Sequence, residues 1–226
     1  MREKVKEIVK SNVLLNKWAR KLQRILLIFR KTIIGNDNII VNNGYCHKVK
    51  YDIVGNSNKI EIGKNSTLNN TTIHIRGNGH FLKIGQNCSY GGGSLRFEDD
   101  NCKIIIGDNT SVGSAHISAT EPDKSIIIGS DCLFSYNIEL RTGDSHSIID
   151  LHTEKRINYA QDIVIGNHVW IGALSIILKG VEIGSNSIIG TNSLVTSNIS
   201  PNSLAVGVPA RVVKDSVDWK VERIYE

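Results

Sequence analysis

The stretch that decides the fold runs from residue 163 to residue 196 and reads IVIGNHVWIGALSIILKGVEIGSNSIIGTNSLVT. Apolar residues recur in it at a step close to six, and the last five are six residues apart. A helix repeats every 3.6 residues and a strand every two, so neither gives this step. A repeat of fixed length instead indicates a solenoid, in which each repeat stacks on its neighbours. The repeating positions are Val164, Ile171, Ile177, Ile183, Ile189 and Val195.

An isoleucine followed by glycine recurs over a much longer part of the chain. Asn, Asp or His follows at short range, then usually Ser, Thr or Cys, as in Ile106-Gly-Asp-Asn-Thr110. The steps between these pairs are 28, 22, 22, 22, 37 and 18 residues. Because three sides of six residues make a rung of 18, the last step predicts a three-sided coil with a narrow apolar interior. The pairs begin at Ile34, Ile62, Ile84, Ile106, Ile128, Ile165 and Ile183.

The longer steps predict wide corners and one insertion. A rung of 22 residues has four more than a rung of 18, and turn-forming segments at equivalent offsets fit such corners. The step of 37 exceeds 22 by 15, which places an inserted loop within the polar stretch 141–160. A solenoid that interrupts itself once usually does so for a site. The wide corners are 55–58, 77–80, 98–101 and 121–124.

The composition agrees with many short strands joined by turns. The chain has 226 residues, among them 34 Ile and 22 Asn but only 3 Pro and 1 Met. Ile favours strands, and Asn tolerates the left-handed backbone of tight turns. The four cysteines form no C-x-x-C pair, so we expect neither a disulfide framework nor a zinc knuckle, and a reducing cytoplasm.

The N-terminal segment, residues 1–32, differs from the rest. Residues 1–31 carry a charge of +8 and residues 32–226 a charge of −3, for a total of +5. Residues 2–30 place their apolar side chains on one helical stripe among Lys and Arg, which predicts a basic amphipathic helix. Two interpretations stay open: the stripe packs on the body or a partner subunit, or it binds an anionic membrane surface.

The location expected for the protein is the cytoplasm, with peripheral contact at the inner face of the cytoplasmic membrane through residues 1–30. The longest apolar run has five residues, whereas a membrane-spanning helix needs about 20. No cleavable signal peptide is visible.

Motifs near the C-terminus resemble those of the hexapeptide-repeat acyltransferases. They are Trp170-Ile-Gly172, Ile177-Leu-Lys-Gly-Val181 and Gly207-Val-Pro-Ala-Arg211, and they are specific when found together. The resemblance covers residues 33–214. It implies a left-handed parallel β-helix, acetyl-CoA as co-substrate, and a homotrimer with active sites between subunits. We therefore divide the body into a β-helix domain, 33–206, with an inserted loop at about 141–160, and a C-terminal cap, 207–226.

The segment Arg141-Thr-Gly-Asp-Ser-His-Ser147 looks like the catalytic strand and loop of the subgroup that O-acetylates sugars and bacterial surface polysaccharides. An alcohol is a poor nucleophile at neutral pH, and imidazole is suited to take its proton. We therefore expect His146 to be the catalytic base. Asp144, two residues earlier, would orient the acceptor or hold the imidazole tautomer. The alternatives for that second role are Glu139 and Asp150.

The resemblance also implies which residues bind acetyl-CoA. Trp170 would flank the thioester or the acceptor, and the backbone N–H of Ala173 would stabilise the oxyanion. Ser197 stands where related sugar acetyltransferases often have Lys, so one phosphate contact is missing from the pattern. The other expected contacts are Thr191 and Thr196 for the pantetheine arm and nucleotide, and Arg211 and Lys214, with Lys179 as a further candidate, for the phosphates.

The remaining histidines receive structural interpretations. We expect His47, His74 and His80 to face solvent in early rungs or wide corners, and His168 to be a turn residue. No third histidine has the spacing that the zinc site of a γ-class carbonic anhydrase needs, so we expect no metal.

These features predict an acetyl-CoA-dependent O-acetyltransferase that acts through a ternary complex on a hydroxyl of a bacterial surface glycan: capsule, O-antigen or lipo-oligosaccharide. An alternative stays open: acetylation of a small molecule, either the amine of an amino-sugar nucleotide or the hydroxyl of a simple sugar or antibiotic. The slightly acidic body with few aromatic residues does not indicate nucleic-acid binding.

Overall fold

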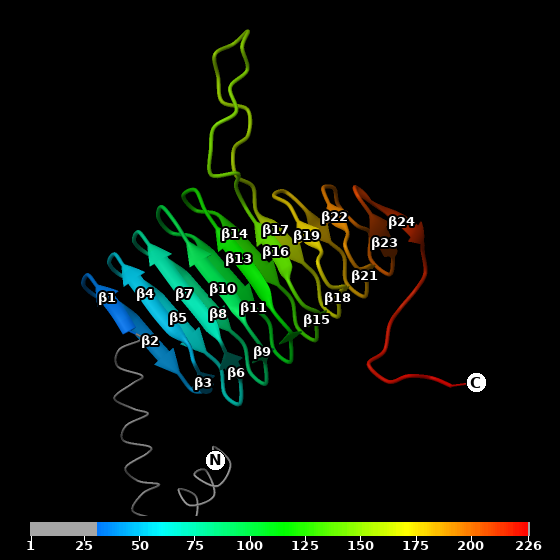
Figure 1. Ribbon diagram of the computed structural model, residues 1–226, viewed down its shortest axis with the longest axis horizontal. Helices are drawn as coiled ribbons and strands as arrows, with labels where there is room; N and C mark the ends of the chain where they lie inside the picture. The colour runs from blue at the N-terminus through cyan, green and yellow to red at the C-terminus, as the bar shows by residue number, and fades with distance from the viewer. Residues whose placement is uncertain (1–30, 226) are drawn as a thin grey trace, which may run out of the picture.

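The described part of the chain, residues 31–225, is a parallel β-helix in the computed structural model (Figure 1). The chain winds through three sheets in turn, so strands that are neighbours in sequence lie in different sheets. The predicted basic helix, residues 2–30, lies outside the described residues. The coil begins at Lys31, two residues before the expected boundary at residue 33.

The three sheets have eight, seven and nine strands. The first sheet contains β1 (Lys31–Ile34), β4 (Lys50–Val54), β7 (Thr71–Arg76), β10 (Gly93–Phe97), β13 (Ala115–Ala119), β16 (Ile138–Arg141), β19 (Ile176–Ile177) and β22 (Leu194–Val195). The second contains β2 (Ile39–Asn42), β5 (Lys59–Ile62), β8 (Phe81–Ile84), β11 (Lys103–Ile106), β14 (Ser125–Ile128), β17 (Ile163–Ile165) and β20 (Glu182–Ile183). The third contains β3 (Tyr45–His47), β6 (Thr67–Asn69), β9 (Ser89–Tyr90), β12 (Ser111–Val112), β15 (Leu133–Phe134), β18 (Trp170–Ile171), β21 (Ile188–Ile189), β23 (Leu204–Gly207) and β24 (Ala210–Lys214).

The repeat read from the sequence is the register of the β-ladders. In the second sheet, isoleucines 22 residues apart are aligned, and the step becomes 37 and then 18 where the sequence predicts it. The inward side chains of one rung, Ile53, Ile60 and Leu68, come one from each sheet and are at most 1% exposed. Burying an aliphatic side chain of this size contributes about 1.5–3 kcal/mol. The aligned residues are Ile62, Ile84, Ile106, Ile128, Ile165 and Ile183.

The first member of the predicted repeat is wrong. Ile34 lies in the first sheet, where it pairs with Val54, whereas the residue aligned with Ile62 is Asn42. Asn42 is exposed at the start of the described coil, so the apolar side chain that marks this position elsewhere is not needed there.

Each rung has three corners. We call the turn from the first to the second sheet the first corner, the turn from the second to the third sheet the second corner, and the turn from the third back to the first sheet the third corner. At the second corner each rung places one residue in the left-handed conformation, with φ between 55° and 64°. Asn adopts this conformation at little cost, which explains the Asn-rich composition. The series is Asn65, Asn87, Asn109, Asp131, His168, Asn186 and Asn202.

At the first corner, side chains bond to the backbone of the preceding rung. Asn78 Oδ1 accepts from the backbone N–H of Asn56 (2.9 Å), and Asp100 Oδ1 accepts from that of Asn78 (2.8 Å). Gly77 has a φ of 119°, and a Cβ there would overlap the carbonyl oxygen of Asp99 on the next rung. The four wide corners expected from the sequence all lie here, between strands of the first and second sheets.

The expectation that His80 faces solvent is wrong, because this residue is 1% exposed. Its backbone N–H donates to Asn58 Oδ1 (2.9 Å), and its ring Nδ1 accepts from the backbone N–H of Cys102 (3.1 Å). Ring Nε2 lies 3.3 Å from the carbonyl oxygen of Arg76. The imidazole thus continues a buried polar row from one rung to the next. Burial lowers the pKa of His80 below its ordinary value of 6.5.

The coil is interrupted between β16 and β17, where residues 142–162 project from the first corner as a long loop (Figure 1). At the C-terminal end, β24 turns back antiparallel along β23 and covers the edge of the third sheet. No helix within residues 31–225 is long and apolar enough to cross a membrane.

We expect the His80→Asn variant to lose part of the acid sensitivity of folding. Below pH 6.5 the unfolded chain binds a proton at residue 80 that the folded chain does not, so stability falls as the pH falls. Asn occupies the equivalent place in the preceding rung, at Asn58, and fits the row without a titrating group. Denaturant unfolding at pH 7.5 and pH 5 measures the effect. An equal loss of stability in the variant and the parent would contradict this account.

Candidate active site

His146 lies in the first arm of the inserted loop, close to the coil. The loop leaves the end of β16, and an antiparallel bridge between Ile149 and Arg156 joins its two arms. The His146 side chain is exposed to solvent. An exposed imidazole at this place can meet an acceptor that lies on the surface of the coil.

The carboxylate of Asp144 does not lie against the imidazole of His146. It forms an ion pair with Lys179 and accepts a hydrogen bond from Asn158 Nδ2 (2.9 Å). The hydrogen bond from Lys179, with that from Asn158, lowers the pKa of Asp144 below its ordinary range. Asp144 is therefore held ionised by the coil and the second arm of the loop.

The two alternative carboxylates are engaged elsewhere. Glu139 pairs with Arg141 on the outer face of the first sheet. Asp150 accepts from the backbone N–H groups of His152 (2.9 Å) and Thr153 (2.8 Å), and so caps the turn at the loop tip. Within residues 31–225, no carboxylate is hydrogen-bonded to the ring of His146.

A groove of about 180 Å³ opens on the outer face of the first sheet beside the loop. Arg96, Ser118 and Arg141 stand in one row across three rungs and form its floor. Ser145, the neighbour of His146 in sequence, lies at its edge. Hydroxyl, guanidinium and carboxylate groups of this kind bind sugar hydroxyls and acidic groups. The lining residues are Arg96, Glu98, Ser118, Thr120, Arg141, Gly143 and Ser145.

Ala173 and Thr191 lie one rung apart at the third corner, where the N–H of Asn192 donates to the carbonyl of Ala173 (2.8 Å). Within the described part of the chain, the backbone N–H of Ala173 has no hydrogen-bond acceptor. The hairpin between β23 and β24 ends at the same corner and carries the exposed Arg211. A free backbone donor, a hydroxyl and a guanidinium thus follow one another along the coil axis.

The other predicted cofactor residues lie elsewhere on the coil. Lys179 and Thr196 follow strands of the first sheet and so lie at the first corner, where Thr196 is exposed and Lys179 pairs with Asp144. Trp170 lies on the outer face of the third sheet, 40% exposed. Lys214 is exposed at the end of β24. The predicted residues therefore occupy all three sides of one chain.

Trp219 is a residue of this region that sequence reasoning missed. The C-terminal tail returns along the second corner and buries Trp219, whose ring stacks on His168 with centroids 4.2 Å apart. Its Nε1–H donates to the carbonyl of His168 (2.8 Å), and its ring lies 6.1 Å from that of Trp170. The tail has no repeat that would have placed it. The signal available was one large aromatic residue in an otherwise polar segment.

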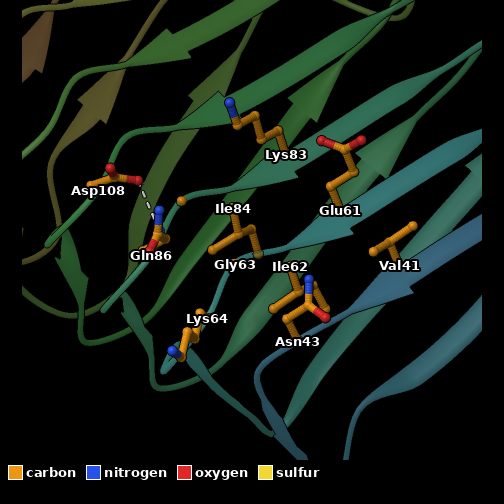
Figure 2. Close-up of a pocket in the computed structure, with 11 residues that line it drawn as sticks. Val41, Asn43, Glu61, Ile62, Gly63, Lys64, Lys83, Ile84, Gln86 and Asp108 are labelled. Carbon is orange, nitrogen blue, oxygen red and sulfur yellow. Dashed lines mark hydrogen bonds between the residues drawn. The ribbon is translucent and has the colours of Figure 1, made fainter.

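A larger hollow, of about 510 Å³, lies beside the second sheet in the early rungs (Figure 2). It carries charges of both signs, with Glu61 aligned to Lys83 across two rungs and Asp108 accepting from the backbone of Gln86 (2.8 Å). None of the predicted site residues lines it. The smaller groove beside His146 is therefore the candidate acceptor site.

Residues 31–225 contain no group of three or more His, Cys, Asp or Glu side chains placed to hold a metal ion.

Comparison with known proteins places this geometry in a family. The family model described as bacterial transferase hexapeptide (six repeats) matches residues 162–197. A polysialic acid O-acetyltransferase of Escherichia coli O1:K1 is 35% identical over 89 residues, which are 39% of this chain and 29% of that protein. The galactoside O-acetyltransferase of Escherichia coli K12 is 49% identical over 71 residues, 30% of this chain and 35% of that protein. These sequence matches span about a third of the relatives' length.

Two solved structures match almost the whole coil. The polySia-specific acetyltransferase NeuO is 31% identical with a TM-score of 0.78, over 87% of this chain and 92% of that one. The polysialic acid O-acetyltransferase OatWY is 30% identical with a TM-score of 0.79, over 86% of this chain and 93% of that one. The chain belongs to the hexapeptide-repeat acetyltransferases. The predicted family and the predicted left-handed parallel β-helix are thereby confirmed.

We expect Trp219→Ala to release the C-terminal tail. Removing a buried Trp side chain costs about 3–5 kcal/mol, and Trp219→Phe, which removes the bond to His168, costs about 1 kcal/mol. Limited proteolysis of residues 215–225 measures the release, and Val221→Ala, at a residue that is 75% exposed, is the control. A tail in Trp219→Ala that is cut no faster than in the control would show that this contact does not hold it.

Proposed function

We propose that the chain transfers an acetyl group from acetyl-CoA to a hydroxyl of a bacterial surface glycan such as a capsule polysaccharide, an O-antigen or a lipo-oligosaccharide. The observation that carries this proposal is the agreement of the whole coil with two polysialic acid O-acetyltransferases at 30–31% identity. The inserted loop with His146 and the polar groove beside it are the features that such a reaction needs.

The residues at the third corner fit acetyl-CoA. An unpaired backbone N–H at Ala173 suits an oxygen that gains negative charge, and Arg211 suits a phosphate. Thr191 lies on the rung between them and would contact the pantetheine arm. Trp170 would flank the acyl end, and Thr196 and Lys214 remain further candidates at the edges. Acetyl-CoA supplies an activated acetyl thioester.

His146 would act as the general base. Its imidazole would take the proton of the acceptor hydroxyl as the hydroxyl oxygen forms the new ester bond, and would later release that proton to the departing thiolate sulfur. The four cysteines do not offer a nucleophile in this region: three are buried in the coil, and burial raises the pKa of Cys132 to about 11. Direct transfer within a ternary complex is therefore the mechanism we propose.

The acceptor would lie in the groove of Arg96, Ser118 and Arg141, whose edge at Ser145 adjoins the base. Two guanidinium groups favour an acceptor with a carboxylate or several hydroxyls, and Glu98 and Glu139 partly balance their charge. The polar lining thus suits a sugar better than an apolar small molecule.

A homotrimer with active sites between subunits would bring the proposed groups together. In one chain, His146 lies at the first corner and Ala173 at the third corner, at opposite ends of the first sheet. A strand of four or five residues at about 3.3 Å per residue separates these corners by roughly 15 Å. Side chains that far apart do not act on one substrate atom. A second copy that presents its third corner to the loop of the first would complete the site.

The proposed location is the cytoplasm, at the inner face of the cytoplasmic membrane, where residues 1–30 would bind anionic lipid. Their charge supports this proposal, since each Lys or Arg near an anionic surface contributes about 1 kcal/mol.

We expect His146→Ala to lower kcat by at least about 10²-fold while acetyl-CoA still binds, because the variant lacks the base but keeps the third corner. His152→Ala, which changes an exposed histidine at the tip of the same loop, is the matched control and keeps its rate. Near-normal turnover in His146→Ala would remove the base from the mechanism.

The acceptor class is tested by acetyl-CoA consumption with an anionic polysaccharide, a neutral galactoside and an amino sugar. We expect an alkali-labile product from the polysaccharide, because an oxygen ester is cleaved by alkali and an amide is not. An alkali-stable product from the amino sugar would establish the alternative, N-acetylation of a small molecule.

We expect deletion of residues 1–30 to weaken co-sedimentation with vesicles of anionic lipid at low salt. Salt should weaken binding of the full chain in the same way, because it screens exposed charges. Activity per site on a soluble acceptor should stay unchanged. A deletion variant that is trimeric but inactive would assign this segment to the active site instead.

A further inference from the structure

Asn158 is a buried polar residue, 8% exposed, in a loop whose other residues from 144 to 157 are mostly exposed. Its Oδ1 accepts from the backbone N–H of Ile148 (2.8 Å) and from Arg156 Nε (3.1 Å). Its Nδ2 donates to Asp144 Oδ2 (2.9 Å) and to the carbonyl of His146 (2.8 Å). A side-chain amide has two donors and two acceptor sites, so all four are occupied.

These bonds fix the backbone on both sides of the proposed base. Asn158 belongs to the second arm of the loop, and the groups that it holds belong to the first arm at Asp144, His146 and Ile148. Alternate positions of the first arm are thus tied to one side chain. The ring of His146 takes no part in this network and stays open to solvent.

The network is anchored to the coil on the rungs before and after the loop. Lys179, on the rung after it, pairs with Asp144 and donates to the carbonyl of Asn158 (3.0 Å). Glu121, on the rung before it, pairs with Arg156 and accepts from the backbone N–H of Ala160 (3.2 Å). Two positive and two negative charges therefore surround the amide. We call Asn158, Asp144 and Lys179 the loop clamp.

Such an anchor answers a physical need of the proposed reaction. Exposed loops are mobile, and a displacement of about 1 Å in a reacting group can lower a rate by about 10²-fold. The β-ladders end at β16 and begin again at β17, so they hold neither arm near His146.

We propose that Asn158 is a positioning residue for the reaction, which with Asp144 and Lys179 holds the loop so that His146 meets the acceptor hydroxyl. This inference rests on the proposed function, in which His146 is the base. The clamp acts through the backbone of His146 and leaves the proton affinity of its ring unchanged. Lys179 and Asp144 thus serve the histidine from the coil and the loop, in place of the direct roles expected from the sequence.

The test compares Asn158→Ala, Asn158→Asp and the reciprocal pair Asp144→Asn with Asn158→Asp. We expect Asn158→Ala to lower kcat by about 10²-fold with the KM for acetyl-CoA and the midpoint of the pH–rate profile unchanged. Asn158→Asp places two carboxylates together and should lose at least as much. The reciprocal pair restores an amide–carboxylate contact and should recover part of that loss.

Asn198→Ala is the matched control, because Asn198 also caps a backbone N–H at the first corner, that of Glu182 (2.9 Å), but does not touch the loop. Hydrogen exchange gives a readout that is independent of activity: the amide of Ile148 should exchange faster in Asn158→Ala than in the parent and in Asn198→Ala. A normal rate in Asn158→Ala, an equal fall in Asn198→Ala or a shifted pH–rate midpoint would overturn the positioning role. If His146→Ala keeps its rate, the base and the clamp both fall; if only His146→Ala loses rate, the base stands and the clamp falls.

Discussion

The constraint on which the structure depends is that each rung satisfies its backbone hydrogen bonds through the rungs stacked on either side. The strands cannot shift singly, because their inward isoleucines would leave the narrow interior. The same constraint reaches the corners, where Asn and Asp side chains bond to the preceding rung and Gly77 packs directly against the next. Local turn chemistry and long-range stacking therefore agree at every rung.

A site on such a coil has to be added without disturbing the stack. The inserted loop meets this condition, because it leaves after β16 and returns to β17 while Ser118 stays aligned with Arg141 and Ile128 with Ile165. The loop itself gains no ladder, so its order has to come from side chains. The loop clamp supplies that order with charged groups from the neighbouring rungs. Rigid scaffold and reactive histidine are thus made by different kinds of interaction.

The sequence predicts the parts that repeat and not the parts that occur once. The steps of 22, 37 and 18 residues predict the rung lengths and the insertion, because each inward isoleucine reports its own place. At the start of the coil Ile34 misled, since apolar residue and glycine also occur together at the first corner. His80 was misplaced because its burial depends on rungs on both sides. For Asn158, Asp144 and Trp219, contacts between segments 14 to 51 residues apart decide the role, and no periodicity records them.

The constant register makes the coil a ruler marked in whole rungs. Trp170, Ile188 and Leu204 are aligned on successive rungs of the third sheet, and neighbouring strands lie about 4.8 Å apart. The span from the acyl end to the phosphate end of a ligand laid along the axis is thus fixed as a small integer times that spacing. Point substitutions can alter what a mark on this ruler binds, but only gain or loss of a complete rung can alter the length it measures.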